Sequence, residues 1–227
     1  MNIIEIKNLT KSFLQGSNKI NILNELNLVV PAASKVGIVG QSGSGKSTFL
    51  SLMSGLDKPD QGEILVNNCD ITKMSEEELT EFRAKNLSIV FQQYHLVAHL
   101  TALENVMLPL EILDHDLSKK NIKDKAIELL KEVGLEKRLS HFPSQLSGGE
   151  SQRVAIARAL ITTPKVILAD EPSGNLDLET GTKVMNLFMS IIDKYQITTL
   201  LVTHNPELAS LCQSVYKLNH GKFEKLK

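Results

Sequence analysis

The amino-acid sequence predicts an α/β fold with a mostly parallel core sheet, an antiparallel β part near the N-terminus and a helical subdomain. Strand and helix patterns alternate at both ends of the chain. Short apolar runs there are typical of strands buried in a parallel sheet, whereas the middle of the chain is mainly helical in pattern. We expect one domain over 1–227, whose core comprises 1–92 and 151–227 and whose helical subdomain is 93–150.

The N-terminal part is rich in strand patterns. Alternating apolar residues predict strands over 3–9 and 25–30, and a continuous apolar run predicts a buried strand over 35–40. A helix is expected over 46–55, followed by a turn and a strand within 60–68. This order predicts that the antiparallel β part precedes and flanks the first strand of the parallel sheet.

Two capping boxes mark helix starts in the middle of the chain. Ser75 pairs with Glu78 and Thr101 with Glu104 at the spacing that satisfies free N–H groups at a helix N-terminus. A strand leading into a loop is expected between them, at 87–96. The remaining expected elements are helices 121–135 and 149–161, strand 165–170, helix 180–195, strand 198–203, helix 205–212 and a hairpin over 215–226.

Composition restricts the class of partner and the compartment. A net charge of −1 and a pI near 6.6, with no cluster of Lys and Arg, do not suggest nucleic acid as a partner. Cys69 and Cys212 fit no metal-binding spacing, so two reduced cysteines are expected. The N-terminus lacks the pattern of a signal peptide and no apolar run is long enough to span a membrane. We therefore expect a cytoplasmic protein.

The segment "GQSGSGKS", residues 40–47, fits the phosphate-binding pattern G-x-x-x-x-G-K-[ST] and lies between an expected strand and an expected helix. Glycines let the backbone N–H groups surround a phosphate, and the helix start adds positive potential. Lys46 would reach the β- and γ-phosphates, and the Ser47 hydroxyl would bind Mg²⁺. The segment therefore predicts a nucleotide site.

The segment "VILADE", residues 166–171, supplies acidic groups for the same site. Its apolar run predicts a buried strand that delivers Asp170 to the carboxyl edge of the sheet, beside the phosphate loop. Asp170 would hold Mg²⁺ directly or through water, and Glu171 would orient and polarise the attacking water.

With "LSGGE" at 146–150 added, the chain resembles the nucleotide-binding subunits of ABC transporters over essentially its whole length. These subunits have a RecA-like core. The other motifs of that family follow in the expected order: Phe13 for the adenine-stacking aromatic, Gln92 for the Q-loop, Asp177 for the D-loop and His204 for the switch histidine. The resemblance implies an active ATPase, because no departure, such as Phe13 for Tyr or Glu150 for Gln, removes an expected catalytic atom.

The resemblance assigns each motif residue a role. It implies that catalysis involves Glu171, His204 and Gln92, and that Mg²⁺ is held by Ser47, Gln92 and Asp170. It implies that ATP is contacted by Phe13, Gly40, Ser42, Gly43, Ser44, Gly45, Lys46, Ser47, Thr48, Ser147, Gly148, Gly149 and Asp177.

The expected helix start at 147–149 has exposed N–H groups that suit a phosphate, as the helix start after the phosphate loop does. A second such site would be redundant within one chain. In the family that this chain resembles, the signature contacts the γ-phosphate of ATP bound to the opposite subunit. The resemblance thus implies a homodimer that sandwiches two ATP molecules.

Two segments, 100–110 and 169–177, are similar to the LolD/MacB/YbbA group of that family. The group pairs with permeases that have FtsX-like domains, which implies a peripheral position on the cytoplasmic face of the membrane and a role in lipoprotein release or macrolide export. We also expect exposed apolar residues within about 92–109, with Leu100 and Leu108 among them, to form a groove for a permease helix. The alternative is an FtsE-like ATPase that regulates periplasmic cell-wall hydrolases. The sequence leaves open the substrate, the permease and the direction of transport.

Overall fold

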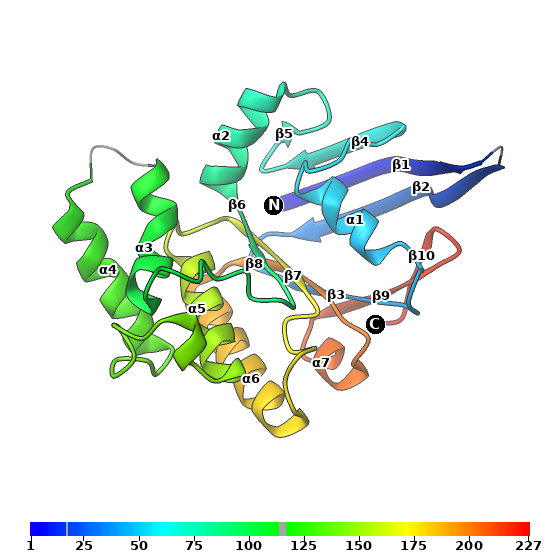
Figure 1. The fold of residues 1–227 in the computed structure, drawn as a ribbon. Coiled ribbons are helices and arrows are strands. Elements are labelled where there is room, and N and C mark those ends of the chain that lie inside the picture. The colour runs from blue at the N-terminus through cyan, green and yellow to red at the C-terminus, as the bar shows by residue number, and fades with distance from the viewer. Residues whose placement is uncertain (17, 114–116) are drawn as a thin grey trace.

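The protein is described from a computed structural model that covers residues 1–16, 18–113 and 117–227. The strands form two sheets (Figure 1): a four-stranded sheet with the order β2-β1-β4-β5 and a six-stranded sheet with the order β10-β9-β3-β8-β7-β6. This arrangement confirms the expected fold class, an antiparallel β part beside a mostly parallel sheet. The division of the chain at residues 92 and 150 stays a prediction.

The four-stranded sheet is antiparallel throughout. Its first two strands are longer than their hydrophobic alternation predicts, because cross-strand pairing continues beyond the alternating residues as far as Gln15 and Asn18. The strands are β1 (Asn2–Gln15), β2 (Asn18–Pro31), β4 (Gln61–Val66) and β5 (Cys69–Asp70).

The six-stranded sheet is parallel except for the hairpin at its edge, where β10 pairs antiparallel with β9. Since the other five strands run in one direction, their carboxyl ends meet at a single edge. The strands are β3 (Lys35–Val39), β6 (Leu87–Val90), β7 (Val166–Asp170), β8 (Thr198–Val202), β9 (Ser214–Asn219) and β10 (Lys222–Lys225).

Three helices, α3, α4 and α5, pack on one another at the side of the molecule away from the antiparallel sheet (Figure 1). Within the described ranges, no helix is both long and apolar enough to cross a membrane. The helices are α1 (Lys46–Met53), α2 (Glu76–Asn86), α3 (Ala102–Leu113), α4 (Lys119–Glu132), the short 3₁₀-helix η1 (Pro143–Gln145), α5 (Gly148–Leu160), α6 (Leu178–Tyr195) and α7 (Pro206–Ser210).

Both predicted capping boxes are present. The Ser75 hydroxyl accepts from the Glu78 N–H at 3.2 Å, while the Glu78 carboxylate accepts from the Ser75 N–H at 2.8 Å. Thr101 and Glu104 make the same exchange at 3.3 and 2.8 Å. Each box satisfies N–H groups that would otherwise lack an intrahelical partner and so fixes where α2 and α3 begin.

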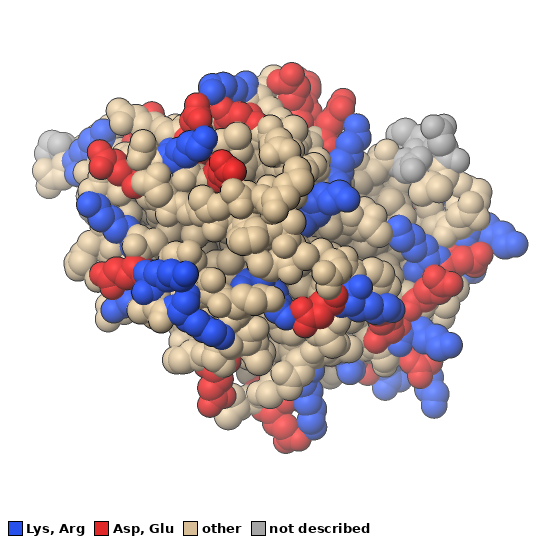
Figure 2. Space-filling view, turned by 180° about the vertical axis from the view of Figure 1, so that it is seen from behind, with Lys and Arg blue, Asp and Glu red and all other residues tan. Residues whose placement is uncertain are grey.

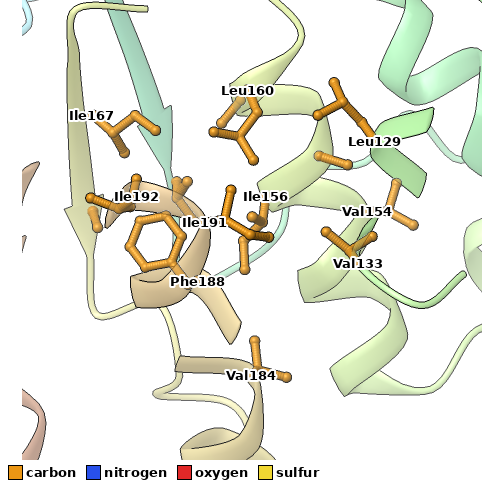
Figure 3. Close-up of a cluster of buried hydrophobic side chains, with 14 of the residues drawn as sticks. Leu129, Val133, Val154, Ile156, Leu160, Ile167, Val184, Phe188, Ile191 and Ile192 are labelled. Carbon is orange, nitrogen blue, oxygen red and sulfur yellow. The ribbon is translucent and has the colours of Figure 1, made fainter. Parts of the chain in front are cut away.

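Two hydrophobic clusters lie on opposite faces of the parallel sheet. Strand β7 contributes to both because alternate side chains point to opposite faces: Ile167 belongs to the cluster with α5 and α6, whereas Leu168 belongs to the cluster with α1 and the antiparallel sheet. Figure 3 shows Phe188 of α6 beside Ile192, with Ile167 of β7 nearby. The central strands are thus fixed from both sides.

Charged side chains of both signs are interspersed on the face that Figure 2 shows. No extended field of one sign covers the described part of this face, in agreement with the formal net charge of −1.

Truncating Phe188 to alanine should destabilise the protein by about 3–5 kcal/mol, because the ring is fully buried and its removal leaves a cavity. Urea unfolding followed by circular dichroism measures this loss. Leu226→Ala is the matched control: Leu226 is 59% exposed, and its truncation should change the unfolding free energy by less than about 0.5 kcal/mol. Equal effects of the two substitutions would contradict the assignment of Phe188 to the core.

Candidate functional site

The loop between β3 and α1 is the predicted phosphate loop. Gly43 and Gly45 have φ values of 79° and 101°, a left-handed region that glycine adopts readily. Gly45 is the N-cap of α1, and a Cβ on it would lie 2.8 Å from Cγ2 of Ile22. These glycines let the chain turn sharply into the helix, and the free N–H groups of the first turn give the loop its affinity for anions.

Lys46 is held across this loop. Its ammonium group donates hydrogen bonds to the carbonyl oxygens of Gly40 and Gln41, both at 2.9 Å. An ammonium group has three donors, so one remains for a phosphate oxygen. The loop thus fixes the lysine in place before a nucleotide is bound.

Asp170 ends β7 and is half-buried. Burial raises the pKa of its carboxyl group above the ordinary value, the negative charge of Glu171 adds to this rise, and the positive charge of Lys46 opposes it. A cation beside Asp170 would offset both the cost of burying its negative charge and the repulsion from Glu171. The Asp170 carboxylate is therefore suited to bind a metal ion.

Glu171 lies in a strained turn directly after β7, with a φ of 46°. Its N–H donates to the carbonyl oxygen of Val202 at 2.9 Å, which holds the turn against β8. Its Oε2 lies 2.7 Å from Nδ1 of His204 and accepts a hydrogen bond from the His204 backbone N–H at 3.3 Å. Two predicted catalytic residues, 33 positions apart in the sequence, are thus in direct contact.

Most of the predicted residues share one cavity of about 620 Å³. It lies at the carboxyl edge of the sheet, where ligands bind in open α/β folds. Two lining residues, Ile22 and Gln41, were not predicted from the sequence. The predicted residues in the lining are Gly40, Ser42, Gly43, Gly45, Lys46, Ser47, Thr48, Gln92, Asp170, Glu171 and His204.

The cavity brings together three oxygen donors of the kind that a hard divalent cation prefers. The Ser47 hydroxyl, the Asp170 carboxylate and the Gln92 amide all line it. Mg²⁺ takes a few protein oxygens and completes its shell with water and phosphate. The donor set therefore fits Mg²⁺ bound together with a nucleotide.

Other predicted residues do not line this cavity. Phe13 is 47% exposed, with Nζ of Lys11 5.2 Å from its ring centroid. Ser44 turns its hydroxyl inward, toward Gly40. A Cβ added to Gly40 would lie 2.6 Å from the Ser44 Oγ. Asp177 is the N-cap of α6 and accepts from the Thr180 N–H at 3.0 Å, a hydrogen bond that lowers the pKa of its carboxyl group.

The signature residues form the start of α5, also outside the cavity lining. Ser147 is the N-cap, and Gly148 and Gly149 are the first two helical residues. Ser147 and Gly148 are exposed, whereas Gly149 is buried where a Cβ would meet Cγ2 of Thr180 at 2.6 Å. Ser147 and Gly148 therefore place the helix start at the surface, while Gly149 allows α5 to pack closely on α6.

Sequence reasoning missed Asn175, which forms a reciprocal pair with Gln92. Nε2 of Gln92 donates to Oδ1 of Asn175 at 3.0 Å, and Nδ2 of Asn175 donates to the backbone carbonyl of Gln92 at 3.0 Å. A Cβ on Gly174 would lie 2.7 Å from the same Nε2. The partners are 83 positions apart, and no local pattern signals the pair.

Arg158 of α5 was also missed. Its guanidinium donates to the carbonyl oxygens of Tyr94 and His95, at 2.7 and 2.6 Å, in a loop where both residues have positive φ. Burial lowers the pKa of Arg158. The contact links the helix that begins at the signature to the loop that follows Gln92.

A phosphate loop at the end of one parallel strand and an Asp–Glu pair at the end of another define a P-loop nucleoside triphosphatase. The family model described as "ABC transporter" matches residues 23–174. The chain belongs to the ABC transporter family and is one of its ATPases. This membership confirms the family resemblance and the expected enzyme class.

Curated relatives extend over nearly the whole chain. "Lipoprotein-releasing system ATP-binding protein LolD" of Treponema denticola is 48% identical over 99% of this chain and 98% of its own length. The protein of the same name from Psychrobacter arcticus is 43% identical over 98% of both. Among solved structures, the dimeric, post-hydrolysis ATP-binding cassette MJ0796 bound to ADP and Pi matches with a TM-score of 0.89, 40% identity and 99% coverage of each chain.

Gly40→Ala should weaken nucleotide binding about tenfold or more, because its Cβ would lie 2.6 Å from Ser44 Oγ and 2.8 Å from the Leu218 carbonyl oxygen. Titration with a fluorescent ATP analogue measures this loss. Gly37→Ala in the preceding strand β3 is the control, since its Cβ would make only an ordinary contact, 3.5 Å from Ala209. Unchanged nucleotide binding by Gly40→Ala would show that the loop tolerates the shift of Ser44 and Leu218 that the added Cβ requires.

Proposed function

We propose that this chain is the ATP-hydrolysing subunit of a lipoprotein-releasing ABC transporter, which works as a homodimer bound to an integral-membrane permease with FtsX-like domains. The observation that carries the proposal is the 48% identity to LolD over 99% of the chain, together with a cavity that joins the phosphate loop to Asp170 and Glu171. The names of the relatives favour lipoprotein release over the FtsE-like regulation of cell-wall hydrolases.

The phosphate loop and Lys46 bind the triphosphate of ATP. Ser47, Gln92 and Asp170 would hold Mg²⁺, which would supply positive charge to offset that of the phosphates. The carboxylate of Glu171 orients a water molecule for attack on the γ-phosphorus and accepts its proton. The bond between the γ-phosphorus and the bridging oxygen of ADP breaks, and ADP and phosphate leave. His204 positions Glu171 through their 2.7 Å contact and lies close enough to the cavity to contact the γ-phosphate.

Two of the predicted residues outside the cavity lining act within their own chain: Phe13 stacks on adenine, and Ser44 shapes the phosphate loop. The others act on ATP bound to the second copy of the chain. Ser147, Gly148 and Gly149 provide the γ-phosphate contact, and Asp177 lies at the subunit interface. Two facts support this assignment: these residues lie outside the cavity lining, and the start of α5 is exposed. The solved structures of MJ0796, which are described as dimeric, also support it.

The permease docks on a groove of about 190 Å³ beside α3. The subunit then works on the cytoplasmic face of the membrane, bound to the permease. Arg158 lines this groove and binds the loop after Gln92, so it offers a path from the permease to the nucleotide. Leu100, which precedes α3, and Leu108 of α3 were expected to be exposed, but both are half-buried. The groove is lined by Ala84, Leu87, Ser88, Ile89, Pro109, Leu113, Arg158, Ala159 and Thr162.

Glu171→Gln should slow ATP hydrolysis about 100-fold or more while keeping ATP binding, because the amide cannot accept the proton of the attacking water. The trapped ATP state should appear as a dimer in size-exclusion chromatography with ATP and Mg²⁺. Glu179→Gln is the control, since that carboxylate is an exposed partner of Lys183. Hydrolysis by Glu171→Gln at the wild-type rate would remove Glu171 as the base.

Introducing Ser147→Arg into the Glu171→Gln protein should abolish the ATP-dependent dimer without weakening nucleotide binding by the monomer, because Ser147 lies outside the cavity of its own chain. Fluorescent-nucleotide titration separates the two effects. Lost binding by the monomer would argue against a role in the second copy.

Leu113→Glu should reduce recovery of the permease when this subunit is isolated by affinity from membranes. Leu113 lines the groove and is 38% exposed. A carboxylate there would have to be buried against the docked permease, which costs free energy. Mass spectrometry identifies and quantifies the integral protein that co-purifies. Leu226→Glu is the control at an exposed leucine elsewhere, and equal recovery with both variants would count against this groove.

A further inference from the structure

The signature helix carries a carboxylate at its phosphate-facing end. Oε2 of Glu150 accepts from the Ser147 N–H at 2.8 Å, and the Ser147 hydroxyl accepts from the Glu150 N–H at 3.2 Å. The serine proposed to contact the γ-phosphate is therefore hydrogen-bonded in both directions to an acidic residue.

The carboxylate of Glu150 is ionised at neutral pH. The hydrogen bond from Arg138, followed by that from the Ser147 backbone, lowers the pKa of Glu150 to about 2. The side chain of Glu150 is only 17% exposed, so water screens its charge incompletely. Left alone, this charge would oppose the approach of a triphosphate to the helix start.

Arg138 lies against this carboxylate from outside the helix. Its Nε donates to Oε1 of Glu150 at 2.7 Å, and one of its terminal nitrogens lies 3.4 Å from Nε2 of His141. Arg138 belongs to the segment between α4 and η1, so the contact depends on tertiary packing and not on helical spacing. The guanidinium provides a full positive charge beside the carboxylate.

We propose that Arg138 is a positioning residue for the ATP-bound dimer. It neutralises Glu150 and keeps that carboxylate bonded to the Ser147 N–H, so that the start of α5 can approach the triphosphate held by a second copy of the chain. This inference rests on the proposed function. Because a two-fold dimer contains two such contacts, a threefold effect at each site becomes about tenfold in the dimer dissociation constant.

The test compares four proteins in the Glu171→Gln background: the parent, Arg138→Gln, Glu150→Gln and the double variant. Analytical ultracentrifugation with ATP and Mg²⁺ measures the dimer dissociation constant. Arg138→Gln should raise it about tenfold, and adding Glu150→Gln should restore it to within about threefold of the parent. Glu150→Gln alone should dimerise at least as tightly as the parent, a result that does not depend on how well Arg138→Gln folds.

Two controls separate charge compensation from general damage. Lys85→Gln removes one partner of an exposed ion pair in α2 and should leave dimerisation unchanged. Nucleotide affinity of the monomers should also stay unchanged in every variant. Arg138→Lys, which keeps the charge, should retain most of the dimerisation.

The outcomes distinguish the two proposals. If the Glu171→Gln parent itself forms no ATP-dependent dimer, the proposed function fails. If the parent dimerises but Arg138→Gln has no effect, or its defect persists in the double variant, the inference about Arg138 is overturned and the proposed function stands. Weakened dimerisation by Glu150→Gln alone would likewise overturn it, since the carboxylate would then be contributing directly.

Discussion

The site depends on the parallel pairing of β3, β8 and β7. Strand β8 pairs with β3 on one side and with β7 on the other, so the residues that follow the three strands meet at one edge. The phosphate loop follows β3, Glu171 follows β7 and His204 follows β8. Side chains from both hydrophobic clusters fix these strands, so the distances within the site depend on packing over both faces of the sheet.

Local sequence patterns predicted the elements that carry this pairing. Continuous apolar runs identified β3, β7 and β8, and the two capping boxes marked where α2 and α3 begin. Glycine spacing identified the phosphate loop, because its left-handed residues follow from local backbone geometry. Strand lengths were less predictable, since the ladder between β1 and β2 depends on a partner strand and continues beyond the alternating residues.

Contacts between distant segments were not predictable from the sequence. Arg138 with Glu150, Arg158 with the Tyr94 carbonyl, and the Glu171–His204 contact all join groups from different segments of the chain. A single sequence shows which residue types are present but not which of them face each other after folding. The family resemblance supplied roles for the motif residues, whereas the polar contacts that orient those residues became visible only with the fold.

The Gln92–Asn175 pair has a mechanical consequence, because one bond uses the glutamine side chain and the other uses its backbone carbonyl. A rotation of the Gln92 side chain breaks only the first bond, at a cost of about 1 kcal/mol. A displacement of the Gln92 backbone breaks both and costs about twice as much. Re-aiming the amide is therefore easier than pulling the Gln92 backbone away from Asn175, so the two loops remain joined when the amide turns.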